Sequence, residues 1–172
     1  MRSRWILIVL LLFAVPILAR AEEREMLVTA YCKCGECNGY TRGSWKFLKL
    51  DQWNRYVSEG SDRGQRYTGK TASGGRLVQA NPGLISTDTA EHPSRIFGRL
   101  LPWNWFSRAG TIAADTRYYP FGTRMYIPEY GWGVVGDRGG AIKGPDHIDI
   151  LFNHHAQTER WGNPHLMVKI VR

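Results

Sequence analysis

The sequence predicts a mainly β protein built around a small closed, or nearly closed, β-barrel with short helices and long loop insertions. Two observations favour this fold class. From Thr111 onward, short segments rich in β-branched and aromatic residues alternate with turns at regular spacing. Only one segment in this half, residues 154–161, is typical of a helix. Many short strands with a single helix are typical of small barrels, which close without a free sheet edge.

The expected strands each end at a turn signal. The first, residues 26–31, leads into a loop with three cysteines. Asn153 stands where it can cap the helix at 154–161, because its side chain can accept from a free backbone amide. Residues 129–131 have the composition of a hairpin turn, and the remaining strands are expected at 111–115, 124–128, 132–137, 147–152 and 166–171.

The stretches between these elements are weakly patterned. Residues 41–67 and 76–110 are irregular and punctuated by glycine or proline, and we interpret both as insertions. Residues 45–56 could form a short helix, and residues 71–75 form a tight turn of small residues. We therefore expect a single domain over residues 22–172, with its core motifs at 110–172 and its N-terminal strand and cysteine loop at 26–40.

The N-terminus has the three parts of a secretory signal peptide. Arg2 and Arg4 precede an apolar stretch at residues 5–18, and the small-x-small sequence at 19–21 follows. We expect cleavage near Ala21, a mature chain that begins at Glu22, and a periplasmic or extracellular location. The alternative is an uncleaved anchor, although the apolar stretch is shorter than the roughly 20 residues that a membrane span needs.

The composition limits the class of partner. A hydrophobic content of 43% excludes a disordered chain. Three of the 23 basic residues lie in the expected signal, which leaves 20 against 15 acidic residues. This excess suits an anionic polymer such as cell wall or a lipid surface, or it only confers solubility. Because no basic run or aromatic-basic motif of a nucleic-acid module is present, we expect no nucleic-acid partner, and we expect a monomer.

Three cysteines, Cys32, Cys34 and Cys37, form one cluster. An oxidising compartment favours a disulfide, either Cys34–Cys37 or Cys32–Cys37, with one thiol left over. A zinc site is the alternative, but it needs a fourth ligand from elsewhere, such as a histidine. The third possibility is that all three thiols are unpaired. His154 and His155 are interpreted as residues at a helix start rather than as ligands.

Three aspartates lie in or at the ends of expected strands, where a turn-forming aspartate is not expected. In residues 147–152, alternation places Asp149 on the face opposite Ile148 and Ile150. Asp115 ends one strand, and Asp137 ends another just before two glycines. Each alone is best explained by capping or an ion pair, but three together favour a site.

The motifs around these aspartates resemble the three-aspartate (3D) domain, which occurs in membrane-bound lytic transglycosylase A and in small secreted muralytic proteins. They are Ala114-Asp115, Pro120-Phe-Gly-Thr123, Tyr126-Ile-Pro128, Gly136-Asp-Arg-Gly-Gly-Ala-Ile-Lys-Gly144, Ile148-Asp-Ile-Leu-Phe152 and Arg160-Trp-Gly162. Val28-Thr-Ala-Tyr31 and Thr71-Ala-Ser-Gly74 are similar to the N-terminal elements of the smaller members. The sequence departs from the pattern at Thr116, where proline is usual, and at Arg138, where a small residue is usual.

The resemblance implies a six-stranded double-psi β-barrel that cleaves the β-1,4 bond between N-acetylmuramic acid and N-acetylglucosamine, leaving a 1,6-anhydro sugar. It also implies that Asp149 is the acid and base, positioned and electrostatically assisted by Asp137 and Asp115. An arginine at 138 would hold Asp137 ionised if the two pair. We expect no cofactor and peptidoglycan glycan as the partner. The residues expected to contact it are Lys143, Gly139, Gly140, Thr71, Ser73 and Tyr119, with Trp132 and Trp161 as further stacking candidates.

Two other functions remain open at this point. The barrel could be a non-catalytic module that binds cell-wall glycan, or a glycoside hydrolase that uses two of the carboxylates and a water molecule.

Overall fold

The computed structural model describes residues 21–43, 53–60, 62–86, 89–90 and 93–171. The expected signal segment, apart from Ala21, lies outside the described residues. Within the part of the chain that the structure describes, no helix has the length and apolar character needed to cross a membrane.

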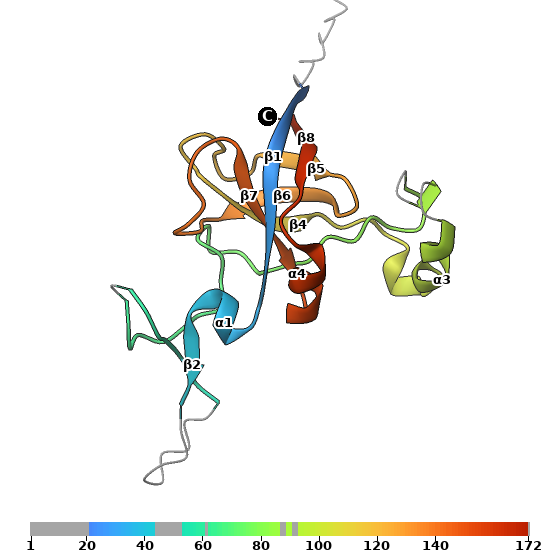
Figure 1. The fold of residues 1–172 in the computed structure, drawn as a ribbon. Helices are drawn as coiled ribbons and strands as arrows, with labels where there is room; N and C mark the ends of the chain where they lie inside the picture. The colour runs from blue at the N-terminus through green and yellow to red at the C-terminus, as the bar shows by residue number, and fades with distance from the viewer. Residues whose placement is uncertain (1–20, 44–52, 61, 87–88, 91–92, 172) are drawn as a thin grey trace, which may run out of the picture.

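Six strands close into a barrel, which confirms the predicted fold class (Figure 1). Around the barrel their order is β1-β7-β4-β6-β5-β8, with β8 returning to β1. The pairs β1–β7 and β4–β6 are parallel and the others antiparallel, which is consistent with a double-psi barrel. The strands are β1 (Ala21–Cys32), β4 (Gly110–Ala114), β5 (Arg124–Ile127), β6 (Gly131–Asp137), β7 (His147–Phe152) and β8 (His165–Val171).

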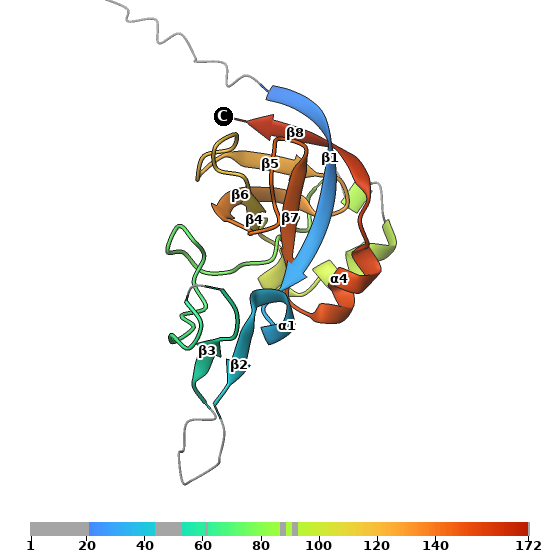
Figure 2. The same cartoon turned by 60° about the vertical axis from the view of Figure 1, so that its left-hand side comes forward.

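Short elements surround the barrel. Figures 1 and 2 show α1 (Gly35–Asn38) and α4 (His155–Trp161) at the end of the barrel where β1 finishes. The strands β2 (Tyr40–Arg42) and β3 (Arg55–Val57) pair as a small separate sheet beyond α1. A group of short helices stands to one side in Figure 1: η2 (Pro93–Arg95), α3 (Ile96–Arg99) and η3 (Pro102–Asn104).

Alternating side chains fill the inside of the barrel. Ile148 and Ile150 of β7 are fully buried there, as the sequence pattern predicts. A second, smaller cluster lies on the opposite face of the same strands and consists of Tyr31, Leu77, Ala113 and Leu151. The apolar residues of β1, β4 and β7 thus pack into two clusters, one inside the barrel and one on its outer face. The candidate site lies next to the outer cluster.

Three local expectations are wrong. Arg55 and Tyr56 belong to a strand, not to a helix over 45–56, whose residues 45–52 lie outside the described part. The residue that caps α4 is His154, not Asn153, and the Gln157 side chain accepts a hydrogen bond from the His154 amide at 3.2 Å. The three cysteines form no disulfide.

Candidate active site

The central strand β4 brings two of the three predicted aspartates together. Ala113 of β4 pairs with Asp149 of β7 on one side and with Asp137 of β6 on the other. Neighbouring strands lie about 4.8 Å apart, so both carboxyl groups start within one strand spacing of Ala113. The two aspartates therefore form a pair on the face of the barrel that carries Tyr31 and Leu151.

A β-bulge aims Asp137 at this face. The pairing of β4 with β6 runs in step up to Ile112 and Val135, and then Ala113 pairs with Asp137, so Gly136 is the extra residue. Val135 points into the barrel core. Strict alternation would place the side chain of Asp137 in the core beside that of Val135. The extra residue instead places Asp137 on the opposite face of β6, where its carboxylate accepts a hydrogen bond from the Tyr31 hydroxyl.

Asp149 is a half-buried carboxyl with unused hydrogen-bonding capacity. Its Oδ1 atom is buried and has no hydrogen-bond partner among the described residues. The pKa of Asp149 is raised from 3.8 to about 6. Burial is the largest cause, a hydrogen bond with Thr29 opposes the rise, and the nearby charge of Asp137 adds to it. A carboxyl with this pKa exchanges its proton near pH 6, so part of the population is still protonated close to neutral pH.

Asp137 is firmly held by donors. Its Oδ1 accepts hydrogen bonds from the backbone amides of Ala72 and Arg138, both at 2.9 Å, and its Oδ2 accepts from the Tyr31 hydroxyl at 3.3 Å. The Arg138 guanidinium does not pair with Asp137 among the described contacts. It lies over the ring of Phe121, with its Cζ 5.1 Å from the ring centroid. Asp137 is thus fixed by backbone and tyrosine, not by its neighbouring arginine.

Asp115 has a different environment from the other two. Arg117 binds its carboxylate in a bidentate ion pair, at 3.0 and 2.6 Å, and the Gly144 amide donates to it at 3.1 Å. The Arg117 guanidinium, helped by Gly144, holds the pKa of Asp115 well below its usual range. No described contact joins Asp115 to Asp137 or Asp149. Its visible role is to tie the end of β4 to the loop before β7.

Residues of β1 complete the site and were not predicted as part of it. Thr29 pairs with Asp149 in the parallel register, and its Oγ1 lies 3.1 Å from Nε2 of His147. Burial lowers the pKa of His147. Burial and the charge of Asp137 raise the pKa of Tyr31, which keeps its hydroxyl a donor. Alternation predicts that Thr29 and Tyr31 share a face, but not that β1 lies beside β7.

The predicted substrate-contacting residues lie in two loops. Thr71 and Ser73 belong to a turn that docks on β6, where the Ser73 amide donates to the Gly136 carbonyl at 3.0 Å. Thr71 is buried, and its Oγ1 accepts from the Gly75 amide at 2.9 Å. The loop between β6 and β7 carries exposed Lys143 and Gly140, together with the half-buried Gly139.

The aromatic candidates fall into two groups. Tyr119 is 1% exposed, packs in the barrel core and donates from its hydroxyl to the Pro145 carbonyl at 2.7 Å. Its ring has no exposed face for a sugar, so we leave it out of the proposed site. Trp161, a stacking candidate in the sequence, packs against the core as well. Trp132 is partly exposed and lines a pocket of about 700 Å³ with Arg124 and Tyr126.

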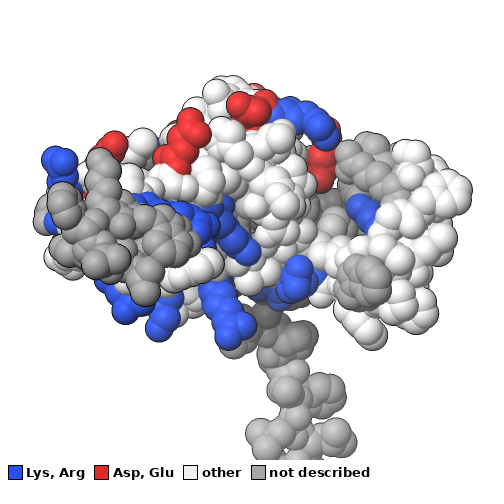
Figure 3. Space-filling view, turned by 90° about the horizontal axis from the view of Figure 1, so that it is seen from below, with Lys and Arg blue, Asp and Glu red and all other residues white. Residues whose placement is uncertain are grey.

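A smaller, basic pocket lies on the side of the aspartate pair. It has a volume of about 240 Å³, and it shares Leu77 with the cluster around Tyr31. Its cationic lining residues are Lys33, Arg55 and Arg76. Figure 3 views the molecule from below and shows more Lys and Arg than Asp and Glu on the visible surface. Neither pocket is lined by any of the three aspartates, but the basic pocket shares Leu77 with the cluster around Tyr31, and the larger pocket at Trp132 does not.

Comparison with known proteins identifies the C-terminal part. Residues 110–172 match the family model of the 3D domain, which confirms the resemblance seen in the motifs. YabE of Bacillus subtilis (strain 168), whose name refers to cell wall shaping, is 36% identical over 63 residues, which are 37% of this chain and 15% of YabE. YocH of the same organism, named as a cell wall-binding protein, is 35% identical over 63 residues, 37% of this chain and 22% of YocH. The chain thus matches less than a quarter of either relative.

Proposed function

We propose that this chain acts at the cell wall and cleaves the glycan strands of peptidoglycan as a lytic transglycosylase, with Asp149 as its acid and base. The 3D-domain match and the cell-wall names of both relatives support the coarser part of this proposal. The expected signal at residues 1–21 fits a periplasmic or extracellular location.

The observation that carries the finer part is the state of Asp149. Its carboxyl combines a pKa raised to about 6 with a buried oxygen that no described residue engages. General acids work best when their pKa lies near the working pH, and enzymes obtain this by burial and by like charges nearby. Both causes are present here, because Asp137 lies across Ala113 from Asp149.

A lytic reaction needs a single carboxyl group. Protonated Asp149 donates its proton to the leaving glycosidic oxygen as the bond to C1 breaks. The resulting carboxylate then accepts the proton of the sugar's own 6-hydroxyl while O6 bonds to C1. The product is a 1,6-anhydro sugar, no water is consumed, and Asp149 is again protonated.

Asp137 is the second charged group of this reaction. Its carboxylate, fixed by three donors, supplies negative charge opposite the positive charge that develops on the sugar ring. Lys143 and the amides of Gly139 and Gly140 are the groups proposed to hold acetamido or lactyl substituents. Thr71 and Ser73 are proposed to border the groove, and Asp115 to position the loop that carries Lys143.

The test is digestion of purified sacculi with the released fragments analysed by mass spectrometry. The unaltered chain should release anhydro-muropeptides, and Asp149→Asn should reduce the rate by about 10²–10⁴, the contribution of a positioned general acid. Asp62→Asn is the matched control, because Asp62 is exposed in a turn after β3. Equal rates for Asp149→Asn and the unaltered chain would contradict the assignment.

Two further outcomes of the sacculus digestion would indicate the alternative functions. Fragments heavier by one water molecule would indicate a hydrolase that uses two carboxylates. Binding to sacculi without any released fragment would indicate a binding module, the function that the name of YocH favours.

A further inference from the structure

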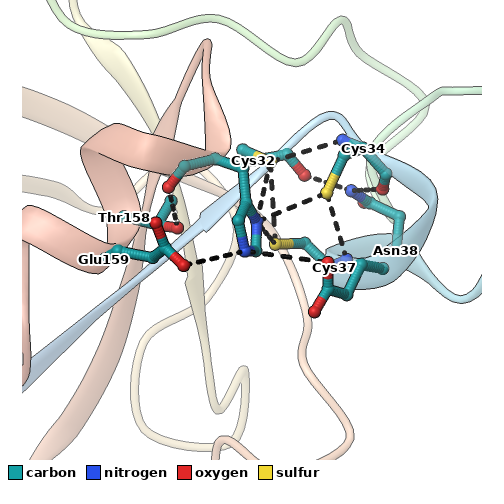
Figure 4. Close-up of polar contacts among 8 residues, drawn as sticks. Cys32, Cys34, Cys37, Asn38, Thr158 and Glu159 are labelled. Atoms are coloured by element: carbon teal, nitrogen blue, oxygen red, sulfur yellow. Dashed lines mark hydrogen bonds and ion pairs between the residues drawn. The ribbon is translucent and has the colours of Figure 1, made fainter.

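Four side chains that can bind a metal meet at the end of β1. They are the three cysteines of the loop and the first residue of α4, namely Cys32, Cys34, Cys37 and His155. Their sulfur and nitrogen atoms all lie within 4.8 Å of one another. Figure 4 shows the cysteine side chains converging between Asn38 on one side and Thr158 and Glu159 of α4 on the other.

The spacing of these atoms matches the edges of a tetrahedron. Nδ1 of His155 lies 3.8, 3.6 and 3.4 Å from Sγ of Cys32, Cys34 and Cys37. The sulfurs of Cys32 and Cys37 are 3.6 Å apart. Zinc bonds of about 2.3 Å to sulfur and 2.0–2.1 Å to nitrogen, at tetrahedral angles, place two sulfurs about 3.8 Å apart and sulfur and nitrogen about 3.6 Å apart.

The local backbone holds the thiols in this arrangement. Cys34 caps the short helix α1, and its Sγ accepts a hydrogen bond from the Cys37 amide at 3.4 Å. The Cys34 amide donates in turn to Sγ of Cys32 at 3.4 Å. Gly39 ends the helix with φ +56°, a left-handed conformation that glycine adopts without strain. Amide donors aimed at sulfur stabilise thiolates rather than neutral thiols.

Carboxylates face the other nitrogen of the histidine. Nε2 of His155 lies 3.7 Å from Glu36 and 3.8 Å from Glu159. A histidine that binds a metal through one ring nitrogen commonly directs its other N–H to a carboxylate, which fixes the ring and raises its basicity. The histidine is therefore oriented with Nδ1 toward the three sulfurs.

We propose that the chain holds one structural zinc ion in tetrahedral coordination, bound by Cys32, Cys34, Cys37 and His155. Three thiolates and one imidazole form a closed site with no open position, which is typical of structural zinc and not of catalytic zinc. Binding releases the thiol protons, so it is linked to pH. The site is independent of the reaction proposed for Asp149.

A disulfide explains less of the geometry. Joining Cys32 to Cys37 would require their sulfurs to move from 3.6 Å to about 2.05 Å. A Cys32–Cys37 disulfide would not explain why Cys34 and His155 point to the same place. One metal ion would bind all four groups.

The zinc ion would fasten the end of β1 to the start of α4, two segments more than 110 residues apart in the sequence. Tyr31, which donates to Asp137, directly precedes the buried ligand Cys32. The site therefore secures the strand that carries Thr29 and Tyr31 of the candidate active site.

The test is metal binding by the reduced, full-length chain. Chelated protein given Zn(II) should take up one equivalent and unfold at a higher temperature. Co(II) in place of zinc should give the sulfur-to-cobalt charge-transfer and tetrahedral ligand-field absorption bands. Cys34→Ser and His155→Gln should lose the ion, and Glu159→Gln should weaken zinc binding by about tenfold.

His165→Gln is the matched control, because His165 is exposed on β8 and outside the cluster. It should bind zinc like the unaltered chain. Failure of the reduced chain to take up zinc, or cobalt spectra without thiolate bands, would overturn the proposal. So would a disulfide that forms in the presence of excess zinc, detected by alkylation and mass spectrometry. If Cys34→Ser or His155→Gln does not fold, the cobalt spectrum of the unaltered chain and the Glu159→Gln affinity still decide.

Discussion

Asp149 keeps its proton to a higher pH in the folded chain than an ordinary aspartate does. Its pKa rises from 3.8 to about 6, first because burial disfavours the charged form. Between these values the folded chain binds a proton that the unfolded chain releases. The free energy of unfolding therefore falls as pH rises through this range, and a buried carboxylate destabilises the fold above about pH 6.

Asp149→Asn should for this reason stabilise the protein at neutral pH. One pKa unit corresponds to about 1.4 kcal/mol, so the gain can reach roughly 3 kcal/mol at pH 8 and should vanish near pH 4. Urea unfolding of both chains at the two pH values measures it. Asp115→Asn provides a comparison of opposite sign, because the pKa of Asp115 is lowered by Arg117. It should lose stability at pH 8 and almost as much at pH 4, because the pKa of the folded carboxyl lies well below 4 and the ion pair with Arg117 persists there. A gain for Asp149→Asn that is equal at both pH values would contradict the ionisation argument.

Single residues differ in how far the sequence predicted them. Alternation in residues 147–152 placed Asp149 opposite Ile148 and Ile150, and the burial pattern confirms this. The partners Tyr31 and His155 could not be predicted, because their contacts join segments more than 100 residues apart. Periodicity within one strand carries no information about which distant strand or helix lies beside it.

Among the secondary-structure elements, β6 and the loop after it show where alternation fails. The bulge at Gly136 reverses the face on which Asp137 lies, and a strict two-residue period does not predict it. The helix expected over 45–56 fails at Arg55 and Tyr56 for a related reason. A short apolar and aromatic run fits a strand as well as a helix, and pairing with β2 decides between them.

Two neighbouring glycines in the loop after β6 should respond differently to alanine. A Cβ atom at Gly139 would lie 2.5 Å from Cγ1 of the buried Ile142, whereas one at Gly140 would have nothing within 4 Å. Gly139→Ala should lower the free energy of unfolding by about 1–3 kcal/mol, as overpacking does. Gly140→Ala should change it by less than about 0.5 kcal/mol. Thermal or urea unfolding of the two variants measures both, and equal losses would show that Ile142 moves aside freely.

For the whole molecule, the strands and the closed barrel followed from the sequence more fully than the site did. Each barrel strand is marked locally by β-branched residues and a turn, so its existence needs no long-range information. Closure by β1 with both β7 and β8 does need long-range information, because no local pattern shows which strands pair. The basic pocket could not be predicted from local patterns either, because its lining residues come from three separate segments.

That pocket is lined by three of the 23 basic residues of a chain with net charge +8. An anionic polymer should be attracted there, and salt should weaken the attraction by screening. We expect the double variant Lys33→Gln/Arg76→Gln to bind purified sacculi about five- to thirtyfold more weakly at low salt, on the basis of roughly 0.5–1 kcal/mol for each of the two exposed charges. The difference from the unaltered chain should shrink at high salt.

Cosedimentation with sacculi at two salt concentrations measures this binding. Arg63→Gln/Arg160→Gln removes the same charge from exposed positions outside the pocket and is the matched control. If binding of the polymer depends on the charges of the basic pocket, this control should bind nearly as tightly as the unaltered chain. An equal loss in both double variants would mean that net charge alone attracts the polymer, and that the pocket does not guide glycan toward Asp149.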